Sequence, residues 1–169
     1  MGDSARLLKA DHDHCCAIWQ NVLIFIWRHV TRPEVVDEHR RYIEQHVAMH
    51  RGPLSLFVIT EPQSQLPDSA TREKLAALLQ AAGPVGCGAA LVYEGTGFRG
   101  AAVRGITSVL NAIARQAFPY KSFGTVEEAA GWLSEIHADK DGKVGSLRAA
   151  NLVEVVAPLR KATSMTSAG

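Results

Sequence analysis

Three glycines near the middle of the chain, Gly95, Gly97 and Gly100, have the spacing GxGxxG. In dinucleotide-binding proteins this spacing allows a tight turn that brings a pyrophosphate to the start of a helix. Here the pattern follows the fourth expected strand, and no acidic residue is placed to bind a ribose hydroxyl. We therefore interpret it as a turn at a strand-to-helix corner. Because Arg99 and Arg104 flank the start of the expected helix, this corner could still bind a small anion such as phosphate.

Histidines suggest metal binding at two places. His39, His46 and His50 share one stripe of an expected helix, so His46 and His50 could bind one ion, but a zinc site needs further ligands. The run 11–16 is also rich in ligand types, and strand alternation places three of them on one side, namely His12, His14 and Cys16. We interpret both sets as polar, solvated faces and predict no metal.

Composition is that of an ordinary globular domain. The 169 residues include 18 basic and 17 acidic side chains and are 47% hydrophobic, which fits one domain and argues against a disordered chain or a basic nucleic-acid-binding face. Three cysteines, two of them adjacent, make a disulfide framework improbable. The longest apolar run, Val22–Trp27, is too short to cross a bilayer, and no secretory signal is visible, so we expect a cytoplasmic protein without a membrane span.

Apolar patterning predicts a flexible lead-in at 1–10, a domain at 11–137, and a linker, an extra helix and a frayed end within 138–169. Five strands are expected, at 15–19, 22–27, 54–60, 88–93 and 120–123, with a tight turn at Gln20-Asn21 joining the first two. Capping patterns predict helices that begin near Thr31, Asp68 and Thr125, and periodic apolar residues predict another after Gly100 and one over 146–160. The order β-β-α-β-α-β-α-β-α predicts a mixed, mostly parallel five-stranded α/β sheet that begins with one antiparallel pair.

The opening strand pair, the strand at 54–60 and the stretch 121–133 together resemble bacterial STAS-like proteins, which are related to anti-sigma-factor antagonists and to the Sec14-type fold. The resemblance covers roughly residues 11–137. It implies a mixed sheet and a protein that acts by binding partners. In antagonist members, a serine in an Asp-Ser step is the regulatory switch, and Asp68-Ser69 falls at that place. The family motif continues with a small residue and glycine, whereas Ala70-Thr71-Arg72 follows here, so Ser69 is also interpreted as an ordinary helix start.

The resemblance implies a non-enzymatic regulatory or signalling module that binds a protein partner, such as a regulatory protein or a kinase. The helix expected over 146–160 could pack on its own sheet or form a homodimer. We predict no nucleic-acid partner, no cofactor and no catalytic residue, because no GxSxG, HExxH, Walker or CxxC pattern is present. Ser69 is the candidate for phosphorylation. The candidate binding residues follow two expected strands, where open α/β sheets place their sites, and are Asp68, Arg72, Gly95, Gly97, Arg99, Gly100 and Arg104. The alternatives are a small-ligand protein that binds a nucleotide, phosphate or lipid headgroup at the turn 95–100, and a metal-dependent enzyme that uses His46 and His50.

Overall fold

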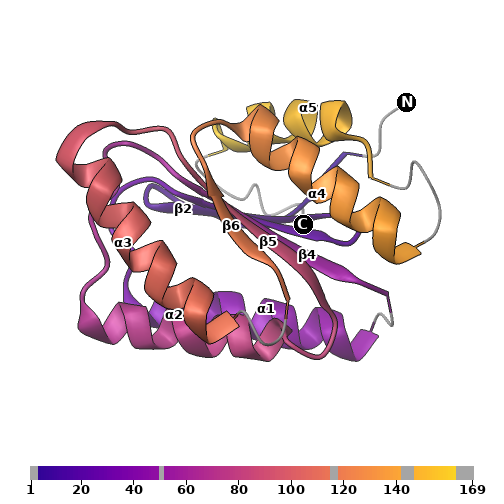
Figure 1. The fold of residues 1–169 in the computed structure, drawn as a ribbon, viewed down its shortest axis with the longest axis horizontal. Helices are drawn as coiled ribbons and strands as arrows, with labels where there is room; N and C mark the ends of the chain where they lie inside the picture. The colour runs from indigo at the N-terminus through magenta and orange to yellow at the C-terminus, as the bar shows by residue number, and fades with distance from the viewer. Residues whose placement is uncertain (1–3, 50–51, 115–117, 142–146, 163–169) are drawn as a thin grey trace, which may run out of the picture.

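A computed structural model describes residues 4–49, 52–114, 118–141 and 147–162, and within these ranges six strands form one sheet (Figure 1). The strands are β1 (Arg6–Ala10), β2 (His14–Trp19), β3 (Val22–Trp27), β4 (Leu54–Thr60), β5 (Gly86–Tyr93) and β6 (Tyr120–Phe123). Their order in the sheet is the same as their order along the chain. The pairs β1–β2 and β2–β3 are antiparallel, and β3 to β6 are parallel.

The predicted five-stranded sheet with one antiparallel pair is wrong in detail, because β1 adds a sixth strand and a second antiparallel pair. This strand lies inside the segment 1–10 that was predicted as a flexible lead-in. Leu7 and Leu8 are adjacent and pack against opposite faces of the sheet, while Arg6 is exposed. β1 is therefore a half-buried edge strand, and it lacks the continuous apolar run that identified β3 and β4.

The helices form two layers, one on each face of the sheet (Figure 1). α1 (Pro33–Met49), α2 (Ser69–Ala82) and α3 (Gly97–Ala114) connect successive parallel strands, and α4 (Val126–Asp141) and α5 (Ala149–Leu159) follow β6. Connections between parallel strands are almost always right-handed, so three crossovers that advance in one direction place all three helices on the same face. The opposite face is covered by α4 and α5.

β3 lies between the two helix layers and has no exposed residue. Alternate side chains belong to the core under α1–α3, namely Leu23, Phe25 and Trp27. The intervening side chains belong to the core under α4 and α5, namely Val22, Ile24 and Ile26. The prediction that this run is covered on both faces is confirmed.

Two helix starts match the predicted caps, whereas the Thr31 hydroxyl, predicted to cap α1, has no hydrogen-bond partner within the described residues. The Asp68 side chain caps α2 by accepting a hydrogen bond from the Thr71 backbone N–H at 2.7 Å, and the Thr125 hydroxyl accepts one from Glu128 N–H at 3.3 Å. α5 confirms the extra helix predicted over 146–160. α4 continues to Asp141, so the linker predicted from residue 139 begins later than expected. Residues 115–117, 142–146 and 163–169, on which other predictions fall, lie outside the described residues.

Arg28, directly after β3, hydrogen-bonds both to the turn before β2 and to the end of α5. Its side chain is 5% exposed. Nη1 donates to the carbonyl of Asp11 at 2.6 Å, and Nη2 donates to the carbonyls of Leu159, Arg160 and Ala162 at 2.9, 3.3 and 2.7 Å. The charge of the buried guanidinium is thus compensated by backbone oxygens at the end of α5 and in the turn before β2.

α1 packs on the sheet through a histidine. His39 is completely buried, and its ring stacks on Phe25 with centroids 4.4 Å apart. Burial lowers the pKa of His39 to about 3, and the nearby His14 and Lys9 lower it further, whereas Asp11 opposes them. Within the described residues, neither ring nitrogen has a hydrogen-bond partner. His39 therefore packs as a neutral aromatic ring.

This burial predicts acid sensitivity. The unfolded chain protonates His39 below a pKa of about 6.5, whereas the folded chain does not until about 3, so stability falls as the pH drops through this window. We expect His39 to reduce the free energy of unfolding by about 2 kcal/mol between pH 7.5 and pH 5. Urea unfolding at both values should show this loss in the native protein and a smaller loss in His39→Leu. Glu44→Gln, an exposed change on the same helix, should retain the native pH dependence; equal losses in all three proteins would contradict the prediction.

Candidate functional site

The carboxyl ends of three parallel strands are aligned at one edge of the sheet, because Trp27 pairs with Thr60 and Thr60 pairs with Tyr93. The connections that follow these strands contact one another. Gln65 N–H donates to the His29 carbonyl at 2.6 Å, joining the connection after β4 to the one after β3. These contacts bring side chains from distant parts of the sequence to one edge.

The two predicted binding surfaces, at 68–72 and 94–104, lie close together. The Arg99 guanidinium donates to the Pro62 carbonyl at 3.1 Å, which links the start of α3 to the connection before α2. Ser69 and Arg72 of α2 also line a groove with Ala102 and Ile106 of α3. The two segments therefore lie side by side, while the binding role of their residues stays a prediction.

Ser69 is the first residue of α2 and is exposed. The preceding Asp68 is the helix cap, and the hydrogen bond from the Thr71 backbone N–H lowers the pKa of its carboxyl. The Asp68-Ser69 step therefore has a structural role through Asp68, and it leaves the Ser69 hydroxyl on the surface.

The glycine pattern is explained by the backbone of the corner between β5 and α3. Gly97 has φ of 70°, a left-handed conformation that glycine adopts without steric cost. A Cβ on Gly95 would lie 2.4 Å from the Tyr93 ring, and one on Gly100 would lie 3.2 Å from the Gly95 carbonyl oxygen. The three glycines thus permit a tight corner, as interpreted from the sequence. The Arg104 guanidinium lies against this corner, 3.3 Å from the Gly100 Cβ position.

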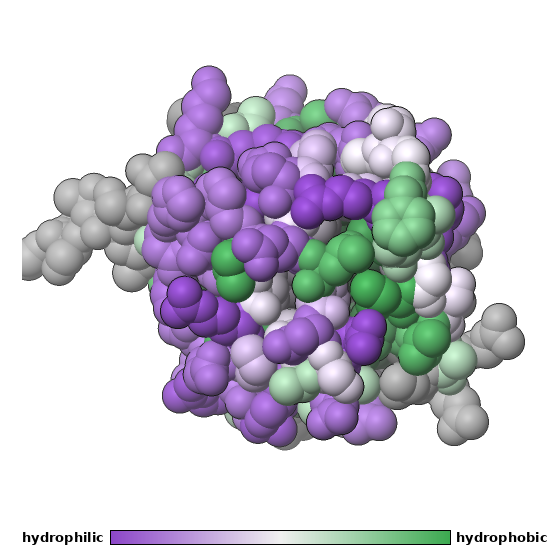
Figure 2. Space-filling view, turned by 90° about the vertical axis from the view of Figure 1, so that its left-hand side faces the viewer, coloured by the Kyte–Doolittle hydropathy of each residue, from purple (hydrophilic) through white to green (hydrophobic). Residues whose placement is uncertain are grey.

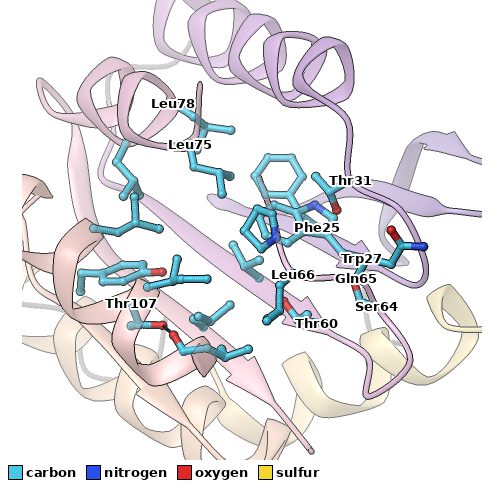
Figure 3. A pocket seen from close by; sticks show the side chains of 18 residues that line it. Phe25, Trp27, Thr31, Thr60, Ser64, Gln65, Leu66, Leu75, Leu78 and Thr107 are labelled. Carbon is cyan, nitrogen blue, oxygen red and sulfur yellow. Dashed lines mark hydrogen bonds between the residues drawn. The ribbon is translucent and has the colours of Figure 1, made fainter. Parts of the chain in front are cut away.

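An apolar pocket with a volume of about 60 Å³ lies between the sheet, α2 and α3, next to these connections (Figure 3). Strands contribute Phe25, Trp27, Val58, Thr60, Leu91 and Tyr120. Helices contribute Leu75, Leu78, Leu79, Val103, Ile106, Thr107 and Leu110. Connections contribute Thr31, Ser64, Gln65, Leu66 and Pro67. Trp27, Thr31 and Gln65 lie together at one end of the pocket, and Thr107 lies at the other end (Figure 3).

Polar atoms of the pocket are hydroxyl, amide and indole groups, and none of the described lining residues is a carboxylate, histidine, cysteine or lysine. Burial raises the pKa of the Tyr120 hydroxyl, so this group stays protonated near neutral pH. Two buried lining atoms, Trp27 Nε1 and Thr31 Oγ1, have no hydrogen-bond partner within the described part of the chain. Burying such groups without a partner is unfavourable. The pocket is therefore mainly apolar, and two of its lining residues each carry a buried polar atom without a partner within the described residues.

Apolar side chains are also exposed on α3 and on the connection before α2. Phe98 and Val109 on α3 are 86% and 63% exposed, and Leu66, before α2, is 39% exposed. Figure 2 views the side on which the parallel strands end and shows hydrophobic side chains gathered on one half of it. α3 thus has one apolar stripe toward the sheet, with Val103 and Leu110, and further apolar residues toward solvent.

Histidines and cysteines are placed differently from the sequence interpretation. His39, His46 and His14 are buried, so the prediction of solvated polar faces is wrong for them, and His50 lies outside the described residues. His12 lies before β2, where it is exposed and stacks on His29 with centroids 4.1 Å apart. All three cysteines are buried and none forms a disulfide within the described residues, and burial raises the pKa values of the Cys15 and Cys16 thiols, to about 11 for Cys15.

Sequence reasoning missed Trp27, Thr31 and Gln65 as pocket residues. Trp27 ends a buried strand, and Thr31 begins the next helix-capping pattern, so their position at a carboxyl edge was a usable signal. Their convergence with Gln65 depends on the connection after β4, whose path no local pattern specifies.

No described helix is both long enough and apolar enough to cross a membrane. The sequence matches no protein-family model, and neither a curated protein nor a solved structure is significantly similar to it.

Proposed function

We propose that this protein is a non-enzymatic regulatory module that binds a protein partner at the face formed by α2 and α3. The observation that carries the proposal is the exposed apolar surface of α3, where Phe98 is 86% and Val109 63% exposed, together with a groove at Val109 that shares Ile106 and Leu110 with the apolar pocket. Exposed apolar surface of this kind is typical of interaction sites. The STAS-like resemblance is consistent with this function, because members of that group generally act by binding partners.

The pocket volume favours a partner side chain over a large ligand. About 60 Å³ is well below the cavity of about 150 Å³ that binds benzene in an engineered protein, so a nucleotide base would not fit. The tip of one aliphatic side chain would fit. Single apolar anchors that enter pockets contribute much of the affinity at protein interfaces.

The charges around the groove favour an acidic partner segment. Arg72, Arg99 and Arg104 are exposed, and Glu73 is the acidic residue that lines the groove. Glu94, at the same corner, is paired with Arg160 at 2.7 Å. We therefore propose that the partner presents an amphipathic segment with an apolar anchor flanked by aspartate or glutamate side chains.

Partner contact at α3 can be tested by photo-crosslinking in the cells that produce the protein. A benzophenone side chain at position 98 should crosslink one defined protein, whereas the same group at Met49, an exposed apolar position on α1, should not. With the purified partner, Val109→Asp should weaken binding about tenfold or more, because it places a charge on the apolar contact, and Met49→Asp should not change it. Equal crosslinking at both positions, or unchanged affinity of Val109→Asp, would contradict the proposal.

A negative charge at Ser69 should weaken the same complex. Ser69 lines the groove, so a phosphate there would face the acidic partner segment. We expect Ser69→Asp to weaken binding about fivefold, which is the size of effect expected from one added surface charge at an interface. Ser69→Ala should bind like the native protein. Ser108→Asp, which adds the same charge at an exposed α3 position that does not line the groove, is the matched control. An equal effect of both aspartates, or none at Ser69, would exclude Ser69 as a regulatory position.

A second candidate function, small-ligand binding, is supported by the unpartnered Trp27 Nε1 and Thr31 Oγ1 at the pocket. These atoms could donate to a carboxylate or carbonyl oxygen whose short aliphatic chain fills the pocket. This ligand differs from the nucleotide, phosphate or lipid headgroup expected at the turn 95–100, where the glycines are accounted for by the backbone.

Butanoate is a suitable probe for this second function. In ¹H–¹⁵N spectra we expect its titration to shift the Trp27 indole N–H resonance saturably, because the carboxylate accepts that hydrogen bond. Thr31→Val should weaken binding about fivefold by removing one hydroxyl donor. Butanol, which lacks the carboxylate, is the control ligand. A shift that does not saturate, or an equal response to both compounds, would exclude this function.

A further inference from the structure

We propose that His12, Asp13 and His29 form a binding site for a divalent transition-metal ion such as Zn²⁺. The three residues lie at the turn before β2 and directly after β3. One potential ligand atom from each lies within 4.8 Å of the other two. This site is separate from the pocket and from the histidines of α1, and it does not depend on the proposed function.

Strand register brings the two histidines together. β2 and β3 form an antiparallel hairpin in which His14 pairs with Trp27. Continuing this register by two residues places His12 opposite His29. The backbone confirms the continuation, because Arg28 N–H donates to the Asp13 carbonyl at 2.8 Å. The hairpin therefore determines which side chains meet.

Distances within the cluster suit a metal ion. Asp13 Oδ1 lies 3.2 Å from His12 Nδ1 and 3.6 Å from His29 Nδ1. Around tetrahedral zinc with bonds of about 2.0 Å, neighbouring ligand atoms are separated by about 3.3 Å. The carboxylate oxygen is thus already at a ligand-to-ligand distance from both imidazoles.

The turn that carries Asp13 is held by its own hydrogen bonds. Asp11 Oδ1 accepts from the backbone N–H groups of Asp13 at 2.8 Å and His14 at 2.7 Å. The position of the Asp13 backbone is therefore fixed before any ion binds. His12 is the adjustable ligand, because its side chain is 82% exposed.

The imidazole rings must change their tilt on binding. They are stacked at 4.1 Å with only 10° between their planes, and His29 Nδ1 lies 3.0 Å from the His12 carbonyl oxygen. A metal lies close to the plane of each imidazole that binds it, so two parallel rings cannot both point at one ion. Rotation of the exposed His12 side chain resolves this conflict without a change in the fold.

The donor set favours zinc, copper or nickel over magnesium or calcium. Two imidazole nitrogens and one carboxylate suit transition metals, whereas Mg²⁺ and Ca²⁺ bind mainly oxygen ligands. Three protein ligands leave a coordination position for water or another molecule, as in catalytic zinc sites.

Metal binding is tested on the full chain after removal of bound metal with a chelator. Titration with Zn²⁺ in a calorimeter should show one ion bound per chain in the micromolar range, and Co²⁺ should give the visible absorption of a nitrogen- and oxygen-ligated ion. His12→Ala, Asp13→Asn and His29→Ala should each weaken Zn²⁺ binding by about tenfold or more. Mg²⁺ should not compete.

Two control variants show whether Zn²⁺ binds at this cluster or at other side chains of the protein. Asp37→Asn removes a carboxylate that pairs with Lys74 on another face, and His50→Ala removes the histidine that the sequence suggested as a ligand. Both should bind Zn²⁺ like the native protein. Circular dichroism of each variant shows whether its fold is retained, and His12→Ala tests the proposal even if Asp13→Asn unfolds, because His12 is exposed. No saturable binding by the native chain, or native affinity in His12→Ala and His29→Ala, would overturn the proposal and leave the cluster as a stacking contact only.

Discussion

The handedness of the crossovers is the constraint on which the rest of this structure depends. β3, β4, β5 and β6 are parallel and in chain order, so each right-handed connection adds its helix to the same face. The other face is left to residues that follow β6, and α4 and α5 provide its cover. Every buried strand residue therefore has a helix layer above or below it, and the strand ends, together with their connections, gather at one edge where the pocket and the groove lie.

At that edge, α3 has more apolar side chains than its packing against the sheet requires. α3 has apolar side chains toward both the sheet and solvent, whereas α2 places Leu75, Leu78 and Leu79 inward. The connection between β4 and α2 lies between them and contributes Leu66 to the pocket and Pro62 to the contact with Arg99. Ile106 and Leu110 of α3 line both the pocket and the groove, which is why we propose that a partner binds at this face.

Local patterns predicted the long apolar strands, the short strand β6 and the helices that begin at Asp68 and Thr125. β3, β4 and β6 match their expected bounds, and α2 begins at the predicted Asp68 cap. β1 was missed because an edge strand is buried on few of its residues, and the charged Arg6 and Lys9 interrupt its short apolar run. The pocket was also missed, since it is lined by residues from four strands, two helices and two connections, whose convergence depends on tertiary packing. The contact between His12 and His29 could have been predicted from the sequence, because the expected turn at Gln20-Asn21 sets a register that places these residues opposite each other.

Arg28 recognises the end of α5 only through backbone oxygens, at Leu159, Arg160 and Ala162. Such a contact is indifferent to which side chains these three positions carry. It depends instead on the length of the segment 159–162. One added or deleted residue would move carbonyl oxygens away from the guanidinium, which is held at the end of β3. The contact with Arg28 therefore restricts the length of this segment, while other contacts restrict its side chains, because Leu159 is buried and Arg160 pairs with Glu94.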